Sequence, residues 1–203
     1  AFQRRFEDEG RFVQRLEQIE PAILSADAQV NRAMLLRQLR DNLTEYEDGL
    51  HLIALDMRSG PQHRHSMIDT LPMMSAQDHE DWLNRLRGLP EQLTQYQALL
   101  SEGISRDRTQ AQIVMSRVPS QIANLITDQA SDSPFYRAFA TMPEEIDPEI
   151  QIWLKSAAVA IIEEQINPAF RELLEFLESE YLPAARPPGI GALPGGKQVY
   201  SRL

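Results

Sequence analysis

Apolar residues recur at steps of three and four through most of this chain, and this spacing constrains the fold more than any other feature. Such steps place side chains on one face of an α-helix, whereas a half-buried strand would alternate with a period of two. The clearest stripe consists of Trp82, Leu86, Leu89, Leu93, Tyr96 and Leu100. No segment shows convincing strand alternation, and the sequence has no internal repeat. We therefore predict an all-α protein, an irregular bundle of several helices.

Polar residues and prolines mark several of the expected helix ends. Ser75 followed by Asp78 has the spacing of a capping box, in which each residue binds a free backbone N–H of the first turn. Asp147-Pro148 predicts another start, since proline at the first helical position loses no hydrogen bond. Gly103 is a reasonable C-terminal stop.

Two further stripes predict helices in the first fifty residues, the second of them capped by Ser25. Their members are Phe2, Phe6, Phe12, Val13, Leu16 and Ile19, and then Val30, Met34, Leu39, Leu43, Tyr46 and Leu50. A long helix is expected after Pro148, with a stripe of Ile150, Trp153, Leu154, Ala157, Ile161, Phe170, Leu173, Phe176 and Leu177. Pro168 lies inside it and predicts a kink or a break near residues 165–167.

Two segments lack this periodicity. Residues 56–74 are punctuated by Gly60-Pro61 and Leu71-Pro72, which predicts a long loop. Residues 183–203 read as a Pro/Gly-rich loop followed by the start of another helix. Because apolar stripes begin at the second residue and the last residues resemble the opening of a helix, we expect residues 1–203 to form one helical lobe of a larger protein. Such a lobe would expose an apolar patch, through which the chain could self-associate.

Composition excludes several classes of function. The formal net charge of −10 argues against a nucleic-acid partner, because phosphate backbones are bound by clustered Lys and Arg. No apolar run approaches the roughly 18 residues needed to cross a membrane. The chain has no cysteine, so disulfides and thiolate sites are excluded. The apolar fraction of 42% suffices for a buried core.

Few residues suggest chemistry, and each has a plainer interpretation. His79-Glu80-Asp81-Trp82-Leu83 approaches a zinc-peptidase helix, but that motif needs a second histidine where Leu83 stands. We therefore expect His79 to be a solvated residue of the first helical turn. His63 and His65 lie two residues apart and fit either a metal site or an exposed polar loop.

Two other groups of residues suggest sites. Gly191 to Gln198 nearly matches a phosphate-binding loop, but Gln198 replaces the required Ser or Thr, so turn glycines are the better interpretation. The carboxylates of Glu144, Glu145, Asp147 and Glu149 fit the positive end of a helix dipole better than acid–base catalysis. No catalytic, metal-binding or cofactor-binding residue is assigned within the chain.

Two regions nevertheless resemble a known family. The first is Asp81-Trp82-Leu83-Asn84-Arg85-Leu86, with Leu89-Pro90, Leu99-Leu100 and Gly103-Ile104 after it. The second runs from Asn167-Pro168-Ala169-Phe170 through Phe176-Leu177 and Glu180-Tyr181-Leu182-Pro183-Ala184-Ala185-Arg186 to Gly191, Leu193-Pro194-Gly195-Gly196 and Tyr200. Their order and spacing resemble the front and middle of the bacterial family of domain of unknown function 885, many of whose members are described as lipoproteins.

The resemblance implies a largely helical protein, two to three times longer than this chain, that looks like a zinc metallopeptidase of the carboxypeptidase type. Its zinc ligands would lie in a C-terminal half beyond Leu203, so no zinc ligand is assigned here. The chain would form part of the wall of a peptide-substrate cleft, where Gly195, Gly196 and Tyr200 are candidate contacts. The resemblance also suggests the cell envelope or periplasm. The alternative is a helical interaction or scaffold module of the cell envelope without enzymatic activity.

Overall fold

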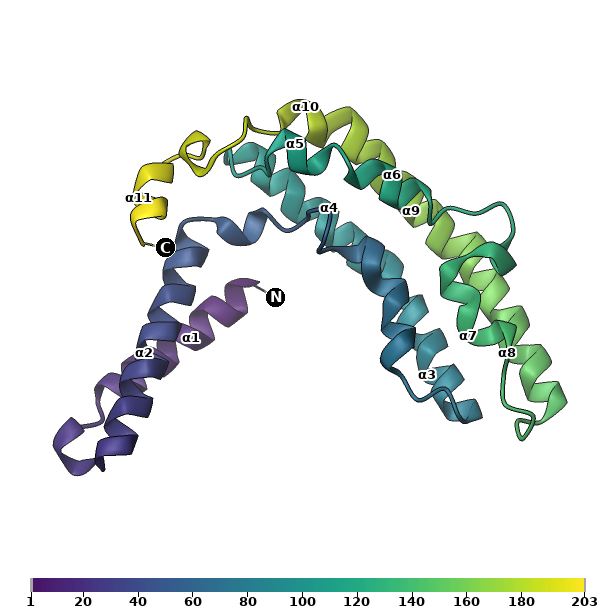
Figure 1. Cartoon of the computed structure of the whole chain (residues 1–203), viewed down its shortest axis with the longest axis horizontal. Coiled ribbons are helices and arrows are strands. Elements are labelled where there is room, and N and C mark those ends of the chain that lie inside the picture. Colours follow the sequence, from purple (N-terminus) through teal and green to yellow (C-terminus); the bar gives the residue numbers. More distant parts are fainter. Residues whose placement is uncertain (1, 203) are drawn as a thin grey trace. The chain divides into compact units, whose positions relative to one another are not determined.

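The computed structural model describes residues 2–202, and within them helices and turns account for the regular structure (Figure 1). The chain divides into two compact units, Ala1–Ile53 and Ala54–Leu203, which are described separately. The expected all-α fold is confirmed. The β pairing among the described residues is a single isolated parallel bridge between Ala111 and Arg186.

The first unit is a helical hairpin. Helices α1 (Phe2–Glu17) and α2 (Ala26–Glu47) pack against each other and are joined through a short 3-10 helix, Pro21–Ile23. A second 3-10 helix, Leu50–Leu52, follows α2. Ser25 caps α2 as predicted, because its hydroxyl accepts a hydrogen bond from the backbone N–H of Ala28 at 3.3 Å.

The buried core of this hairpin is small. It consists of Val13, Leu36 and Leu39, with Leu16 and Leu43 partly buried against them. Several members of the two predicted stripes are exposed instead, namely Phe2, Phe12, Ile19, Val30 and Met34. Each helix of a two-helix hairpin has one neighbour, so only a narrow part of an apolar stripe can be covered by it. The stripes predicted helix formation correctly and overestimated burial.

The second unit contains nine α-helices among the described residues. Their bounds are α3 Ala76–Arg87, α4 Leu89–Ser105, α5 Gln112–Met115, α6 Val118–Ala123, α7 Arg137–Ala140, α8 Pro148–Ile161, α9 Asn167–Phe176, α10 Leu182–Ala184 and α11 Gly196–Arg202. Helix α3 packs on α8, while α4 and α6 pack on α9 (Figure 1). Short 3-10 helices occupy Ala130–Asp132, Pro134–Tyr136 and Ile190–Ala192.

The main core lies between these helices. The stripe on α3 and α4 is buried there as predicted, apart from Tyr96, which is half-buried. The capping box at the start of α3 is also confirmed, since the Ser75 hydroxyl and the Asp78 carboxylate each accept from the other's backbone N–H. Helix α4 continues two residues beyond the stop predicted at Gly103. Asp107 adopts the left-handed conformation (φ 55°) that ends it, and the Arg108 N–H closes on the Gly103 carbonyl at 2.7 Å.

The predicted disturbance before Pro168 takes a defined form. Residues Ile162–Ile166 make a π-helical turn, in which the Asn167 N–H bonds to the Ile162 carbonyl five residues back. A second π-helical turn, Leu177–Tyr181, precedes Pro183 at the same sequence distance as the first precedes Pro168. A π-turn holds one residue more than an α-turn, and it changes the bonding pattern where proline cannot donate. The helical path from α8 through α9 to α10 is therefore continuous.

Residues 56–74 contain no α-helix, as expected, but they are more regular than a loop. Pro61–Thr70 forms ten residues of 3-10 helix. Gly60 permits this start, because its φ of 148° suits glycine and an added Cβ would meet the Leu55 side chain at 2.2 Å.

The Pro/Gly-rich loop is fastened to the segment after α4. Arg186 donates from Nε to the Thr109 carbonyl at 2.9 Å and from Nη1 to the Gly189 carbonyl at 2.7 Å. The buried Tyr181 hydroxyl accepts from the Gln110 N–H at 2.8 Å. Burial raises the pKa of Tyr181, against the opposing effects of that hydrogen bond and of Arg186. These contacts give the second region of family resemblance a structural role.

Candidate functional site

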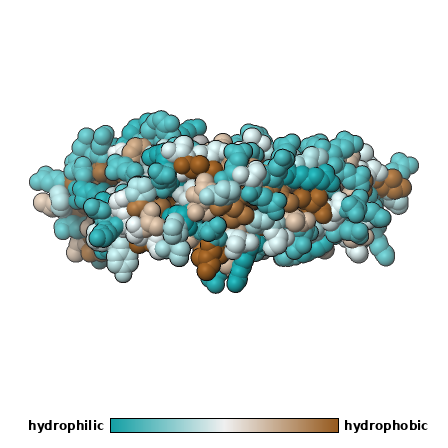
Figure 2. Space-filling model, turned by 90° about the horizontal axis from the view of Figure 1, so that it is seen from above, coloured by the Kyte–Doolittle hydropathy of each residue, from teal (hydrophilic) through white to brown (hydrophobic). Residues whose placement is uncertain are grey.

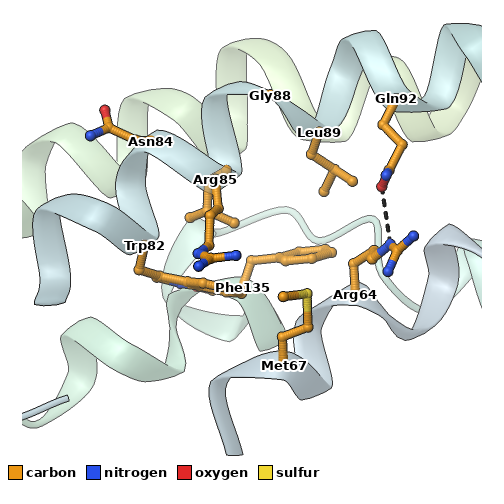
Figure 3. Close-up of a pocket in the computed structure, with 10 residues that line it drawn as sticks. Arg64, Met67, Trp82, Asn84, Arg85, Gly88, Leu89, Gln92 and Phe135 are labelled. Carbon is orange, nitrogen blue, oxygen red and sulfur yellow. Dashed lines mark hydrogen bonds between the residues drawn. The ribbon is translucent and has the colours of Figure 1, made fainter. Parts of the chain in front are cut away.

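A pocket of about 310 Å³ opens beside the joint between α3 and α4, and we call it the α3–α4 pocket (Figure 3). It lies wholly within the second unit. Its lining comes from the 3-10 helix, from both helices and from the segment before α7, and consists of Arg64, Met67, Trp82, Asn84, Arg85, Leu86, Gly88, Leu89, Gln92 and Phe135. The volume is at the lower end of the range found for small-molecule sites.

Two aromatic side chains in the pocket lining are held rigidly. Trp82 is 2% exposed, and its Nε1 donates to the Phe135 carbonyl at 3.2 Å. Phe135 is 1% exposed and stacks on Phe170 with ring centroids 5.8 Å apart, while the edge of His65 meets it at 6.0 Å. Side chains fixed in this way need little reordering when a ligand binds. The apolar part of the pocket is therefore preformed.

Two arginines supply the charge of the pocket. Figure 3 shows the guanidinium of Arg85 beside Trp82 and that of Arg64 beside Gln92, with Phe135 and Met67 between them in that view. Arg64 is half-buried and donates from Nε to the Gln92 Oε1 at 3.0 Å. Arg85 is exposed, and its guanidinium makes no hydrogen bond or ion pair within residues 2–202. No carboxylate of that range belongs to the lining, so the pocket is cationic.

A smaller neighbouring pocket, of about 220 Å³, shares Trp82 and Arg85 with the first and also includes Asp78 and Asp81. Asp78 is engaged in the capping box, and hydrogen bonds from Ser75, chiefly from its side chain, lower the pKa of Asp78. Asp81 accepts from the Gln77 amide at 2.9 Å. Neither carboxylate pairs with Arg85.

His79 is not the solvated residue that the sequence predicted. It is 0% exposed, and its ring joins two parts of the core. Its Nδ1 lies 2.8 Å from the Ser75 carbonyl and its Nε2 lies 3.1 Å from the Ala138 carbonyl. The prediction failed because helix α7 covers the first turn of α3, a long-range contact that local spacing cannot reveal.

The histidines do not fit the zinc that the family resemblance implies. Both nitrogens of His79 already face backbone oxygens, so neither is available to a metal. In the 3-10 helix, His63 Nε2 lies 3.2 Å from the Met57 carbonyl and His65 Nδ1 lies 3.0 Å from the Gln62 carbonyl. Within residues 2–202 no group of three or more His, Asp or Glu side chains is arranged to hold a metal.

The candidate contacts Gly195, Gly196 and Tyr200 lie away from the α3–α4 pocket lining. Gly195 has a φ of 68°, and Gly196 packs so closely that an added Cβ would lie 1.9 Å from the Ile190 carbonyl oxygen. These two glycines are thus explained by backbone geometry. Tyr200 is 70% exposed on α11. Their role in contacting a substrate stays a prediction.

Trp82 and Arg85 belong to the first region of family resemblance, but the sequence alone did not identify them as site residues. Their spacing of three residues places both on neighbouring positions of one helical face, which was a usable signal. The contributions of Arg64, Met67 and Phe135 depend on tertiary packing of segments far away in the chain. No local pattern could have identified them.

The exposed surface bears on the predicted apolar patch. On the face shown in Figure 2, apolar residues occur in separate small groups among hydrophilic ones. Two members of the predicted stripe, Ile150 and Trp153, are exposed on α8, and so is Ile152. No helix among the described residues is long and apolar enough to cross a membrane.

Comparison with known proteins agrees with the resemblance seen in the two motif regions. No curated protein matches the chain. A family model described as "Bacterial protein of unknown function (DUF885)" matches residues 1–203. This match includes helices α3 and α4, the α3–α4 pocket and the Pro/Gly-rich loop that Arg186 holds. The chain therefore belongs to this bacterial family.

Proposed function

We propose that this chain is a helical, substrate-binding portion of a zinc-dependent peptidase-like protein, and that it supplies part of the wall of the substrate cleft but no zinc ligand. The observation that carries the proposal is the α3–α4 pocket. It combines a rigid wall that includes Trp82 and Phe135 with two arginines that form no ion pair within residues 2–202. The carboxypeptidase-type function that the sequence resemblance implies is consistent with this proposal.

The residues of the pocket can bind and orient a peptide end without taking part in bond cleavage. The guanidinium of Arg85 is free to form two parallel hydrogen bonds with a carboxylate. The half-buried Met67 offers apolar surface in the same pocket, whose wall includes the buried rings of Trp82 and Phe135. In such a peptidase, zinc would activate the attacking water, and its ligands would be residues other than those of this chain.

Peptide hydrolysis by the natural protein that carries this chain tests the proposal. With a pooled peptide library, we expect cleavage that a zinc chelator abolishes. Arg85→Ala should raise KM with little change in kcat, because the arginine acts in binding. The matched control is Arg171→Ala, which removes the same charge from an exposed position on α9 and should behave as wild type. Absence of cleavage throughout the library would overturn the proposal.

The alternative is an interaction module of the cell envelope without enzymatic activity. The observation that favours it is the pair of adjacent exposed apolar side chains on α8, Ile152 and Trp153. Under this alternative, Trp153→Ser would weaken association measured by light scattering over a range of protein concentrations, and pocket variants would have no effect. Cell fractionation tests the envelope location separately.

A further inference from the structure

We propose that the α3–α4 pocket recognises a carboxylate that is attached to an apolar group. Two kinds of ligand share this chemistry, namely the free carboxyl end of a peptide with a hydrophobic last residue and a small aromatic carboxylic acid. The preference for a peptide end rests on the proposed function, whereas the preference for an apolar carboxylate rests on the pocket alone.

The charge of the pocket selects an anion. The chain carries a formal net charge of −10, yet the lining of this pocket holds two arginines and no carboxylate among residues 2–202. The guanidinium of Arg64 donates one hydrogen bond, from Nε to Gln92, and the guanidinium of Arg85 donates none to residues 2–202. Asp81, one helical turn before Arg85, is bound to Gln77. Both planar guanidinium groups can therefore turn donors toward a ligand, and their fork matches the two oxygens of a carboxylate.

The apolar surface selects what the carboxylate is attached to. The half-buried Met67 contributes apolar surface between the two arginines in the view of Figure 3, and the pocket is walled by Trp82, Phe135 and Leu89, which are 2%, 1% and 5% exposed. A ligand with an aromatic or aliphatic side chain gains by covering this surface, and inorganic phosphate does not. Gln92 accepts from Arg64 through Oε1, so its amide NH2 can donate to a neutral polar group such as an acyl amide.

Calorimetric titration of the full chain separates these contributions with four ligands. They are N-acetylphenylalanine, its neutral amide, acetate and inorganic phosphate. We expect N-acetylphenylalanine to bind with a dissociation constant on the order of 0.1–1 mM, given its size. Removing the charge or the ring should weaken binding by about tenfold or more. Affinity should also fall with added salt, because the arginines are partly exposed to solvent.

Variants locate the binding. Arg85→Ala should weaken binding of N-acetylphenylalanine by about tenfold, because one charge-assisted pair is lost. Arg171→Ala, the matched control on α9, should leave the affinity unchanged. Circular dichroism checks that each variant is folded, and the comparison of acid with amide on the wild-type protein needs no variant. Equal binding of acid and amide, equal binding of phosphate, or unchanged affinity of a folded Arg85→Ala would each overturn the inference.

A second pair of ligands distinguishes the two sources of the carboxylate. A tripeptide that ends in phenylalanine with a free carboxyl group is compared with the same tripeptide amidated. Tighter binding of the free tripeptide supports both the inference and the proposed peptide substrate. If the free acid binds and neither tripeptide does, the carboxylate preference stands and the proposed peptidase function fails at this pocket.

Discussion

At the scale of single residues, His79 shows how one side chain can join two layers of the core. Its two ring nitrogens face the carbonyl oxygens of Ser75 and Ala138. An imidazole ring carries at least one N–H, so at least one of these two contacts is a hydrogen bond from the ring to a backbone carbonyl. The ring is fully buried. Its removal would leave two buried carbonyls and a cavity between α3 and α7.

His79→Ala should therefore lower the free energy of unfolding by about 2–4 kcal/mol, which combines a lost buried hydrogen bond with a cavity. Urea denaturation measures the change. Gln77→Ala, at an exposed position on the same helix, serves as the control and should cost less than about 0.5 kcal/mol. A loss for His79→Ala as small as that of the control would contradict the bridging role.

The stability of the second unit should depend on pH through His65. Burial lowers the pKa of His65 below its ordinary value of 6.5, assisted by the charges of His63 and Arg137 and opposed by the Gln62 hydrogen bond and Asp69. A lowered pKa means that the unfolded chain binds the proton more readily. The contribution of His65 is thus present above pH 6.5 and is lost as the pH falls below it.

Urea midpoints measured between pH 8 and pH 5 should fall toward the acid end. In His65→Gln this fall should be smaller, because the titrating ring is gone. The carboxylates with lowered pKa values, Asp56 and Asp78, titrate at lower pH. They therefore do not contribute to the change in the urea midpoint between pH 8 and pH 5. An identical pH dependence in wild type and variant would show that other groups control it.

At the scale of elements, the helix starts were predictable wherever the side chain itself makes the cap. Ser25, Ser75 and Asp147 cap their helices through short-range hydrogen bonds. Features that depend on distant packing were not predictable. The 3-10 helix of residues 61–70 has no apolar period of its own, and the π-turns follow from the combination of proline with core contacts on both sides. The pocket mixes both cases, with Trp82 and Leu89 on a visible stripe and Phe135 brought in by tertiary contact.

The attachment of α11 gives a test at this scale. Gly196→Ala places a Cβ where the Ile190 backbone already lies, so the loop and α11 must separate. Hydrogen exchange of residues 187–202 should become faster by tenfold or more, with little change in α4 and α9. Gly191→Ala is the matched control, because an added Cβ there meets nothing within 4 Å. Unchanged exchange in Gly196→Ala would mean that this contact does not hold α11.

At the scale of the whole molecule, the two units have cores of very different size. The hairpin buries Val13, Leu36 and Leu39 together, whereas the second unit buries a continuous cluster drawn from α3 to α9. Full burial of one such side chain contributes about 1.5–3 kcal/mol. Burial of these three side chains offsets only a small part of the conformational entropy that the hairpin loses on folding. The hairpin should be the less stable unit.

Leu36→Ala should make this difference visible. The loss of about 2–4 kcal/mol is comparable to the whole stability expected of the hairpin, so residues 2–53 should exchange amide hydrogens at nearly unfolded rates. Protection in α4 and α9 should stay close to that of wild type. Leu35→Ala, at an exposed neighbouring position, is the control. Loss of protection throughout the chain would show that the two units unfold as one.

The two π-helical turns before Pro168 and Pro183 are wider than α-helical turns, and we call them the wide turns. They also bear on how the length of this chain can vary during evolution. Buried residues run 154, 158, 162, 166 and 170, and four successive steps of four would carry a regular helix about 160° off its original face. The extra residue in Ile162–Ile166 absorbs about 100° of that drift. A one-residue deletion inside the wide turn would therefore leave the downstream side chains facing the core, whereas the same deletion in α8 or α9 would rotate them away. Natural length variation in this helix is expected to concentrate at the two wide turns.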